Sequence, residues 1–109
     1  EDVRLLKQHV KDMRISEELK RYAVDLARAT RGAPSVQLGA GPRASLALTR
    51  MAQALALVQG SDYVKPDHIR DMAVCVLAHR LSLDPSAKFA GRTAVDVVAQ
   101  ILKTVPVPA

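Results

Sequence analysis

The sequence is poor in cysteine, with Cys75 as its one thiol. A single thiol excludes an internal disulfide and a zinc site built on several cysteines, and it fits a reducing cytoplasm. Apolar residues flank Cys75 on both sides in the sequence. We therefore expect Cys75 to be a small buried residue rather than a nucleophile.

Aromatic residues and long apolar runs are also scarce. Aromatics make up 3% of the 109 residues, and no run approaches the roughly 20 apolar residues of a membrane span. The hydrophobic fraction is nevertheless 49%, as in globular domains. The polar start without methionine is not a signal peptide, and it suggests a piece of a longer chain.

Apolar residues recur at spacings of three and four, which predicts an all-α fold: a small bundle of about five helices without strands. The expected helices cover residues 2–13, 17–30 and 42–59, then one from Pro66, a short turn from Pro85 and a last helix after Thr93. Ser16 is the expected N-cap of the second helix. Thr93 and Asp96 have the spacing of a capping box.

The third of these helices is rich in leucine and alanine. We expect it to be the central and most buried helix, because alanines let neighbouring helices approach closely. Its expected apolar residues are Leu46, Leu48, Met51, Leu55 and Val58.

The net charge of +5 favours an acidic partner in principle. A basic helical DNA-binding or histone-fold-like dimerisation module is therefore one hypothesis. A DNA affinity that falls steeply with salt would support it. The positive charges are, however, interspersed with acids along most of the chain, so we expect a solvated helix surface and no nucleic-acid partner.

Arg43 follows a turn of small residues and precedes the third helix. A cation in the first turn of a helix opposes the helix dipole. No acid occurs between Asp25 and Asp62, so no partner is near in sequence. Arg43 is either a surface arginine, solvated or paired with an acid of another helix, or a cation that meets an anion outside the chain.

Catalytic and metal-binding patterns are lacking. The histidines His9, His68 and His79 are not spaced to bind one metal ion, and we interpret them as solvated or partly buried. No phosphate-binding loop with a lysine is present. The chain therefore has no catalytic residues and no metal site that we can predict, and alone it is not expected to be an enzyme.

Several motifs nevertheless occur together and in order. Residues 39–44, GAGPRA, resemble the G-A-S-P-R-A motif of MoxR-type AAA+ ATPases. Further similar segments are residues 52–60, 62–64, 66–69, 79–81, 91–94 and 105–108. The resemblance covers nearly the whole chain and is confined to the C-terminal helical lid of that family. Magnesium-chelatase ATPase subunits are similar to a lesser degree.

The resemblance implies that residues 1–109 form a single helical lid domain, a fragment of a longer ATPase. In such proteins the lid packs on an α/β core, and ATP with Mg²⁺ lies between them. Arg43 would be the sensor-2 residue that reaches the terminal phosphate, and a guanidinium suits that task because it offers forked donors and stays charged. Gly39, Ala40, Gly41 and Pro42 would shape the turn, with Gly41 as N-cap where the family usually has serine.

The Walker A and B segments and the arginine finger are not in this sequence. The fragment alone is therefore expected to bind no ATP or metal and to hydrolyse nothing, whereas the full-length parent would be an ATPase. The resemblance also implies neighbouring subunits of a ring oligomer as partners, together with proteins that contain von Willebrand factor A domains. The function it implies is chaperone-like remodelling or maturation of metalloenzymes, in the cytoplasm.

Overall fold

The computed structural model describes residues 13–32, 36–41 and 43–108. Residues 2–12 of the first expected helix and Pro42 lie outside these ranges. The expected all-α class is confirmed, because five helices dominate the described part of the chain. They are α2 (Glu17–Gly32), α3 (Ala44–Val58), α4 (Pro66–Ala78), α5 (Pro85–Phe89) and α6 (Ala94–Thr104).

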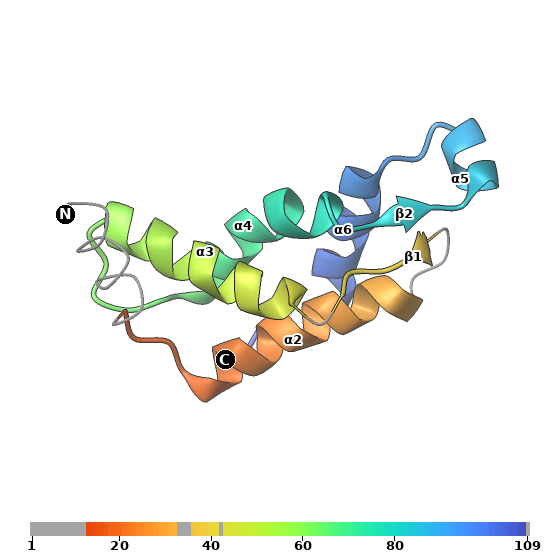
Figure 1. Cartoon of the computed structure of the whole chain (residues 1–109). Coiled ribbons are helices and arrows are strands. Elements are labelled where there is room, and N and C mark those ends of the chain that lie inside the picture. The colour runs from red at the N-terminus through yellow and green to blue at the C-terminus, as the bar shows by residue number, and fades with distance from the viewer. Residues whose placement is uncertain (1–12, 33–35, 42, 109) are drawn as a thin grey trace.

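The helices pack around one core. In Figure 1, α3 and α4 lie side by side and run in opposite directions, and α2 packs against both. Helix α6 fits against α2 and α4, while α5 projects at the end of the molecule away from the N-terminal label. Half-buried Arg70 of α4 connects these layers, because its Nη1 donates to the Leu102 carbonyl (3.1 Å) and to the Tyr22 hydroxyl (3.3 Å).

The expectation of no strand was wrong. β1 (Val36–Leu38) pairs antiparallel with β2 (Ser82–Leu83), and Val36 faces Leu83 in the register. Strands of two and three residues are too short to show the period of two that identifies a strand in a sequence. The sheet connects the segment after α2 to the segment after α4, on the side of the molecule where α5 lies (Figure 1).

Helix α2 follows its sequence signals. The Leu19 N–H donates to Ser16 Oγ (3.2 Å), which confirms the predicted N-cap. Glu17 and Glu18 occupy the first turn, where the helix dipole favours negative charge. The predicted apolar stripe is buried throughout: Leu19, Tyr22, Ala23, Leu26, Ala27 and Thr30.

Helix α3 is less buried than expected, although Leu48, one of its expected apolar residues, is buried. Leu46, Met51 and Val58 are 57%, 42% and 81% exposed, so α3 is not the most buried helix. Its buried residues are Ala44, Leu48, Ala52, Gln53 and Ala56. Alanines four residues apart form a flat row that lets α4 and α2 approach the helix backbone, and this close approach displaces the bulkier side chains to the outside.

Helix α4 corrects two further expectations. Cys75 is exposed rather than buried, because the inward face of α4 is formed by its neighbours Ile69, Ala73, Val76 and Leu77. His68 is buried: its Nδ1 accepts a hydrogen bond from the Lys65 N–H (2.9 Å), and its Nε2 lies 3.1 Å from Gln59 Oε1. Since a backbone N–H can only donate, the Nδ1 carries no proton and the Nε2 donates to Gln59. His68 thus joins the end of α3 to the start of α4.

The capping box of α6 is confirmed. The Asp96 N–H donates to Thr93 Oγ1 (3.1 Å), and the Thr93 N–H donates to Asp96 Oδ2 (3.0 Å). Hydrogen bonds from the Thr93 backbone and side chain, with a smaller contribution from the charge of Arg92, lower the pKa of Asp96 below its ordinary value. The charged form of Asp96 is therefore the one that stabilises the start of the helix.

This gives a pH-dependent prediction for Asp96→Asn. A carboxyl whose pKa is lower in the folded state adds stability above its unfolded pKa of about 3.9, and this stability is lost as the pH falls through the folded value. We expect Asp96→Asn to lower the urea midpoint at pH 6 and to cause a smaller difference at pH 3. Asp71→Asn, at an exposed site on α4, is the control. A difference from wild type that is the same at both pH values would contradict the prediction.

Candidate functional site

Arg43 stands at the N-terminus of α3, where it is the N-cap residue with φ −80° and ψ −9°. The expectation that Gly41 is the N-cap was therefore wrong. The Gly41 carbonyl instead accepts from the Ala44 N–H (3.0 Å), and the Arg43 carbonyl accepts from the Ala47 N–H (3.0 Å). Both bonds use the backbone only, so the side chain of Arg43 has no capping task.

The Arg43 guanidinium is exposed and makes no ion pair or hydrogen bond with any described residue. The one ion pair found in the described ranges joins Lys20 and Glu17, in the first turn of α2. Of the alternatives for Arg43, pairing with an acid of another helix is thus not observed among the described residues. Arg50, the other arginine of the acid-free segment, differs because its Nη1 lies 3.4 Å from Gln53 Oε1.

A buried threonine fixes the turn before Arg43. The Thr30 hydroxyl donates to the Ala27 carbonyl (2.6 Å) and accepts from the Ala40 N–H (2.9 Å). Thr30 is 0% exposed and Ala40 is 1% exposed, so water does not compete for these bonds. The sequence places Thr30 in an apolar stripe but gives no sign that its hydroxyl holds the turn.

Gly39 lets this turn lie directly on α2. A Cβ at residue 39 would stand 2.7 Å from the Arg31 Cα and 2.8 Å from the Arg31 backbone nitrogen. A Cβ at Gly41 would meet nothing within 4 Å. The two glycines therefore differ: Gly39 is needed for close approach of two backbones, whereas Gly41 is exposed beside Arg43.

An open hollow of about 520 Å³ lies beside the start of α3, and its lining residues are Gly41, Arg43, Ala44 and Arg80. These described lining residues include two cations and no acid. Arg80 comes from the turn after α4, which the α3–α4 packing brings to the same end of the domain. Of the expected site residues, the structure brings Gly41 and Arg43 to this hollow, Gly39 and Ala40 form the turn behind it, and Pro42 lies outside the described residues.

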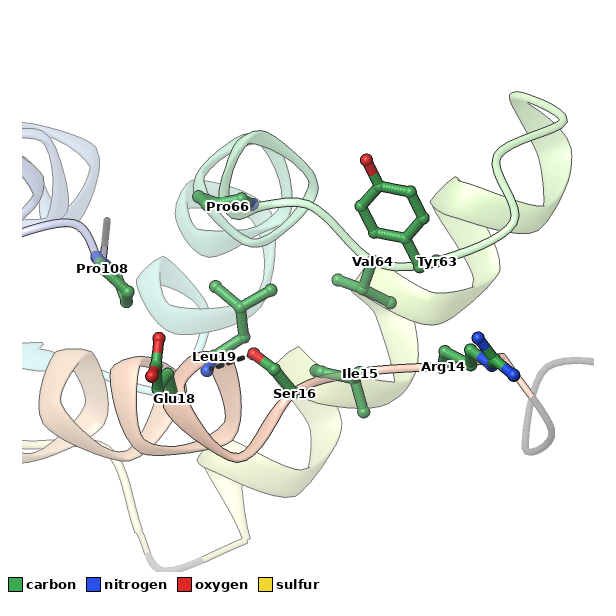
Figure 2. A pocket seen from close by; sticks show the side chains of 9 residues that line it. All are labelled: Arg14, Ile15, Ser16, Glu18, Leu19, Tyr63, Val64, Pro66 and Pro108. Carbon is green, nitrogen blue, oxygen red and sulfur yellow. Dashed lines mark hydrogen bonds between the residues drawn. The ribbon is translucent and has the colours of Figure 1, made fainter.

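A larger hollow of about 630 Å³ lies elsewhere and has a different character. Figure 2 shows it between the start of α2, the link before α4 and the C-terminal tail. Its lining is mostly apolar, with Leu19, Val64 and Pro108 among the side chains drawn. The Val64 N–H donates to the Arg14 carbonyl (2.7 Å), so one wall is a backbone contact between two links. None of the expected site residues lines this hollow.

The described residues hold no group of three His, Cys, Asp or Glu side chains that could bind a metal ion. His68 is occupied by its two hydrogen bonds, His79 is exposed at the end of α4, and His9 lies outside the described residues. None of the helices in those ranges is both long and apolar enough to cross a membrane. Two exposed arginines beside one hollow are suited to binding an anion.

Comparison with known proteins places this geometry in a family. Residues 28–101 match the family described as the AAA lid domain, and the chain belongs to that family. Several of the relatives that it matches are MoxR proteins. Chaperone MoxR1 of Mycobacterium tuberculosis is 41% identical over 73 residues, which cover 67% of this chain and 19% of that protein. The magnesium-chelatase 38 kDa subunit of Rhodobacter capsulatus is 41% identical over 66 residues, 61% of this chain and 18% of that subunit.

Two proteins match over nearly the whole chain. Uncharacterized protein YeaC of Bacillus subtilis is 44% identical over 108 residues, 99% of this chain and 34% of that protein. The crystal structure of a candidate ATPase from Cytophaga hutchinsonii superposes with a TM-score of 0.87 and 29% identity, covering 94% of this chain and 34% of that one. The chain therefore spans about a third of the length of these two proteins. It is a lid domain of the type found in MoxR-like AAA+ ATPases.

Proposed function

We propose that this chain is the C-terminal lid of a longer MoxR-type ATPase and that Arg43 is its sensor-2 residue. The observation that carries the proposal is the exposed and unpaired Arg43, which lies beside a hollow with no acid among its described lining residues. A polyphosphate is the anion that an AAA lid would meet at this place. The forked N–H donors of a guanidinium match the oxygens of a polyphosphate, and a guanidinium stays charged at any ordinary pH.

ATP is held, in this proposal, between the lid and a nucleotide-binding core of the same polypeptide. The described residues at the hollow fit a phosphate group and not a metal, so Mg²⁺ would be held by residues of the core. When bound, Mg²⁺ neutralises charge on the phosphate oxygens. Arg43 would hold the terminal phosphate from the lid side, and the turn anchored by Thr30 and Ala40 would keep it in place.

The parent protein would work as a ring oligomer in the cytoplasm, in which neighbouring subunits complete the nucleotide site. Hydrolysis would drive chaperone-like remodelling or the maturation of metalloenzymes, with proteins that contain von Willebrand factor A domains as partners. The relative named Chaperone MoxR1 supports this class of function. The 109-residue chain alone would not hydrolyse ATP, because a lid supplies only one side of the site.

The test is Arg43→Ala in the full-length protein, measured by steady-state ATP hydrolysis. A hydrogen bond between charged groups is worth about 1.5–3 kcal/mol, so we expect kcat/KM to fall about tenfold or more. Arg50→Ala is the matched control, since Arg50 is an exposed arginine of the same helix outside the hollow. Arg43→Ala with wild-type hydrolysis would reject the sensor-2 role.

A further inference from the structure

A second arginine lines the hollow at Arg43. Arg80 follows the end of α4, where its backbone N–H donates to the Leu77 carbonyl (3.0 Å), and its side chain is exposed. Arg43 and Arg80 come from different helices and are joined at one surface only by the packing of α3 against α4. The structure therefore brings two arginines that are far apart in the sequence to the lining of one hollow.

Helix α4 explains part of this arrangement. A cation after the C-terminus of a helix is favoured by the helix dipole, so an arginine at residue 80 stabilises α4 by itself. The dipole does not explain why this cation shares a hollow with Arg43. Like charges that share a hollow repel each other, and none of the described residues that line it is an acid that would offset the repulsion.

An external polyanion would remove that repulsion. Neither guanidinium has an ion pair or a side-chain hydrogen bond with the described residues, so the donors of both are available. A triphosphate offers several charged oxygens along its length, which is enough to engage two forked groups at once. A single carboxylate could pair with only one of the two guanidinium groups.

We propose that Arg80 is a second phosphate-binding residue, which contacts the polyphosphate of the nucleotide held by Arg43. This inference rests on the proposed function, because it assumes that the nucleotide binds at the Arg43 hollow. Arg80 acts there as a binding residue: it lowers the dissociation constant for ATP through its charge and its forked donors.

The experiment measures ATP binding to the full-length protein by calorimetric titration. Adenosine binding is measured in the same way, by its competition with ATP. We expect Arg80→Gln to weaken ATP binding about fivefold to tenfold. Adenosine, which has no phosphate, should bind as it does to wild type. Arg80→Lys keeps the positive charge but not the forked hydrogen-bond donors, so it should bind ATP more tightly than Arg80→Gln and less tightly than wild type. Arg28→Gln, at an exposed arginine of α2, is the control.

The outcomes separate the two proposals. If Arg43→Ala lowers ATP hydrolysis but Arg80→Gln binds ATP like Arg28→Gln, the role of Arg80 is rejected and the sensor-2 role of Arg43 stands. If Arg43→Ala is silent while Arg80→Gln loses ATP affinity selectively, the sensor-2 role is rejected and Arg80 is confirmed as a phosphate ligand. Equal loss of ATP and adenosine affinity in Arg80→Gln would indicate a disturbed fold and would overturn the inference.

Discussion

Leu48→Ala is expected to lower the free energy of unfolding by about 2–5 kcal/mol. Leu48 is 0% exposed and lies on the face of α3 that packs against the other helices. Its neighbours on that face are alanines, which have no side chain long enough to fill the space that a missing isobutyl group would leave. The expected cost includes both the lost burial of apolar surface and the packing contacts that the cavity leaves unmade.

Leu46→Ala is the matched control, two residues earlier on the same helix. Leu46 is 57% exposed, so its truncation removes little buried surface, and we expect a change within about 0.5 kcal/mol. Urea unfolding of the two variants and the wild-type chain, followed by circular dichroism at 222 nm, measures the difference. Equal destabilisation by both variants would mean that Leu46 is buried as deeply as Leu48, against the exposure seen here.

Local signals in the sequence were sufficient for α2 and for the caps. Ser16, Thr93 and Asp96 act on N–H groups within three residues of themselves, so their roles depend little on the rest of the fold. The stripe of α2 was also predictable, because its charged residues leave only one apolar face. The caps could be predicted from residue types at the helix ends, and the stripe from the helical period.

Helix α3 shows where that reasoning ends. Apolar residues lie on most sides of this helix, and periodicity alone cannot show which of them face the core. The choice depends on how closely α4 and α2 can approach, which is a property of the assembled domain. The burial of Cys75 was wrongly predicted for the same reason. Its apolar neighbours in sequence face the core, whereas Cys75 itself is exposed.

The candidate site divides in the same way. The isolation of Arg43 could be predicted, because a stretch without acids is visible in the sequence. The contributions of Thr30 and Arg80 could not, since each depends on a contact between distant segments. An arginine after a helix and a threonine within one are common, and neither carries a local sign of the hollow that it helps to build.

Gly39→Ala tests whether the turn must lie on α2 for the site to form. The added methyl group would stand 2.7 Å from the Arg31 Cα, a distance that real Cβ atoms do not adopt, and the obstacle is backbone that cannot rotate away. We expect a loss of about 3 kcal/mol of unfolding free energy, at the upper end of the cost of overpacking. Thermal and urea unfolding of the chain measures it.

The same substitution should affect function in the full-length protein although Arg43 is intact. If the turn moves off α2, the hydrogen bond from the Ala40 N–H to the Thr30 hydroxyl breaks. The backbone that positions Arg43 is then no longer held against α2. We therefore expect ATP hydrolysis to fall, at a temperature where the variant is still folded, toward the level of Arg43→Ala. Gly32→Ala is the control for both measurements, because a Cβ there meets nothing within 4 Å and the residue directly follows Arg31. A Gly39→Ala protein that is as stable and as active as Gly32→Ala would show that the turn tolerates displacement, and the positioning of Arg43 would then have to come from the nucleotide-binding core.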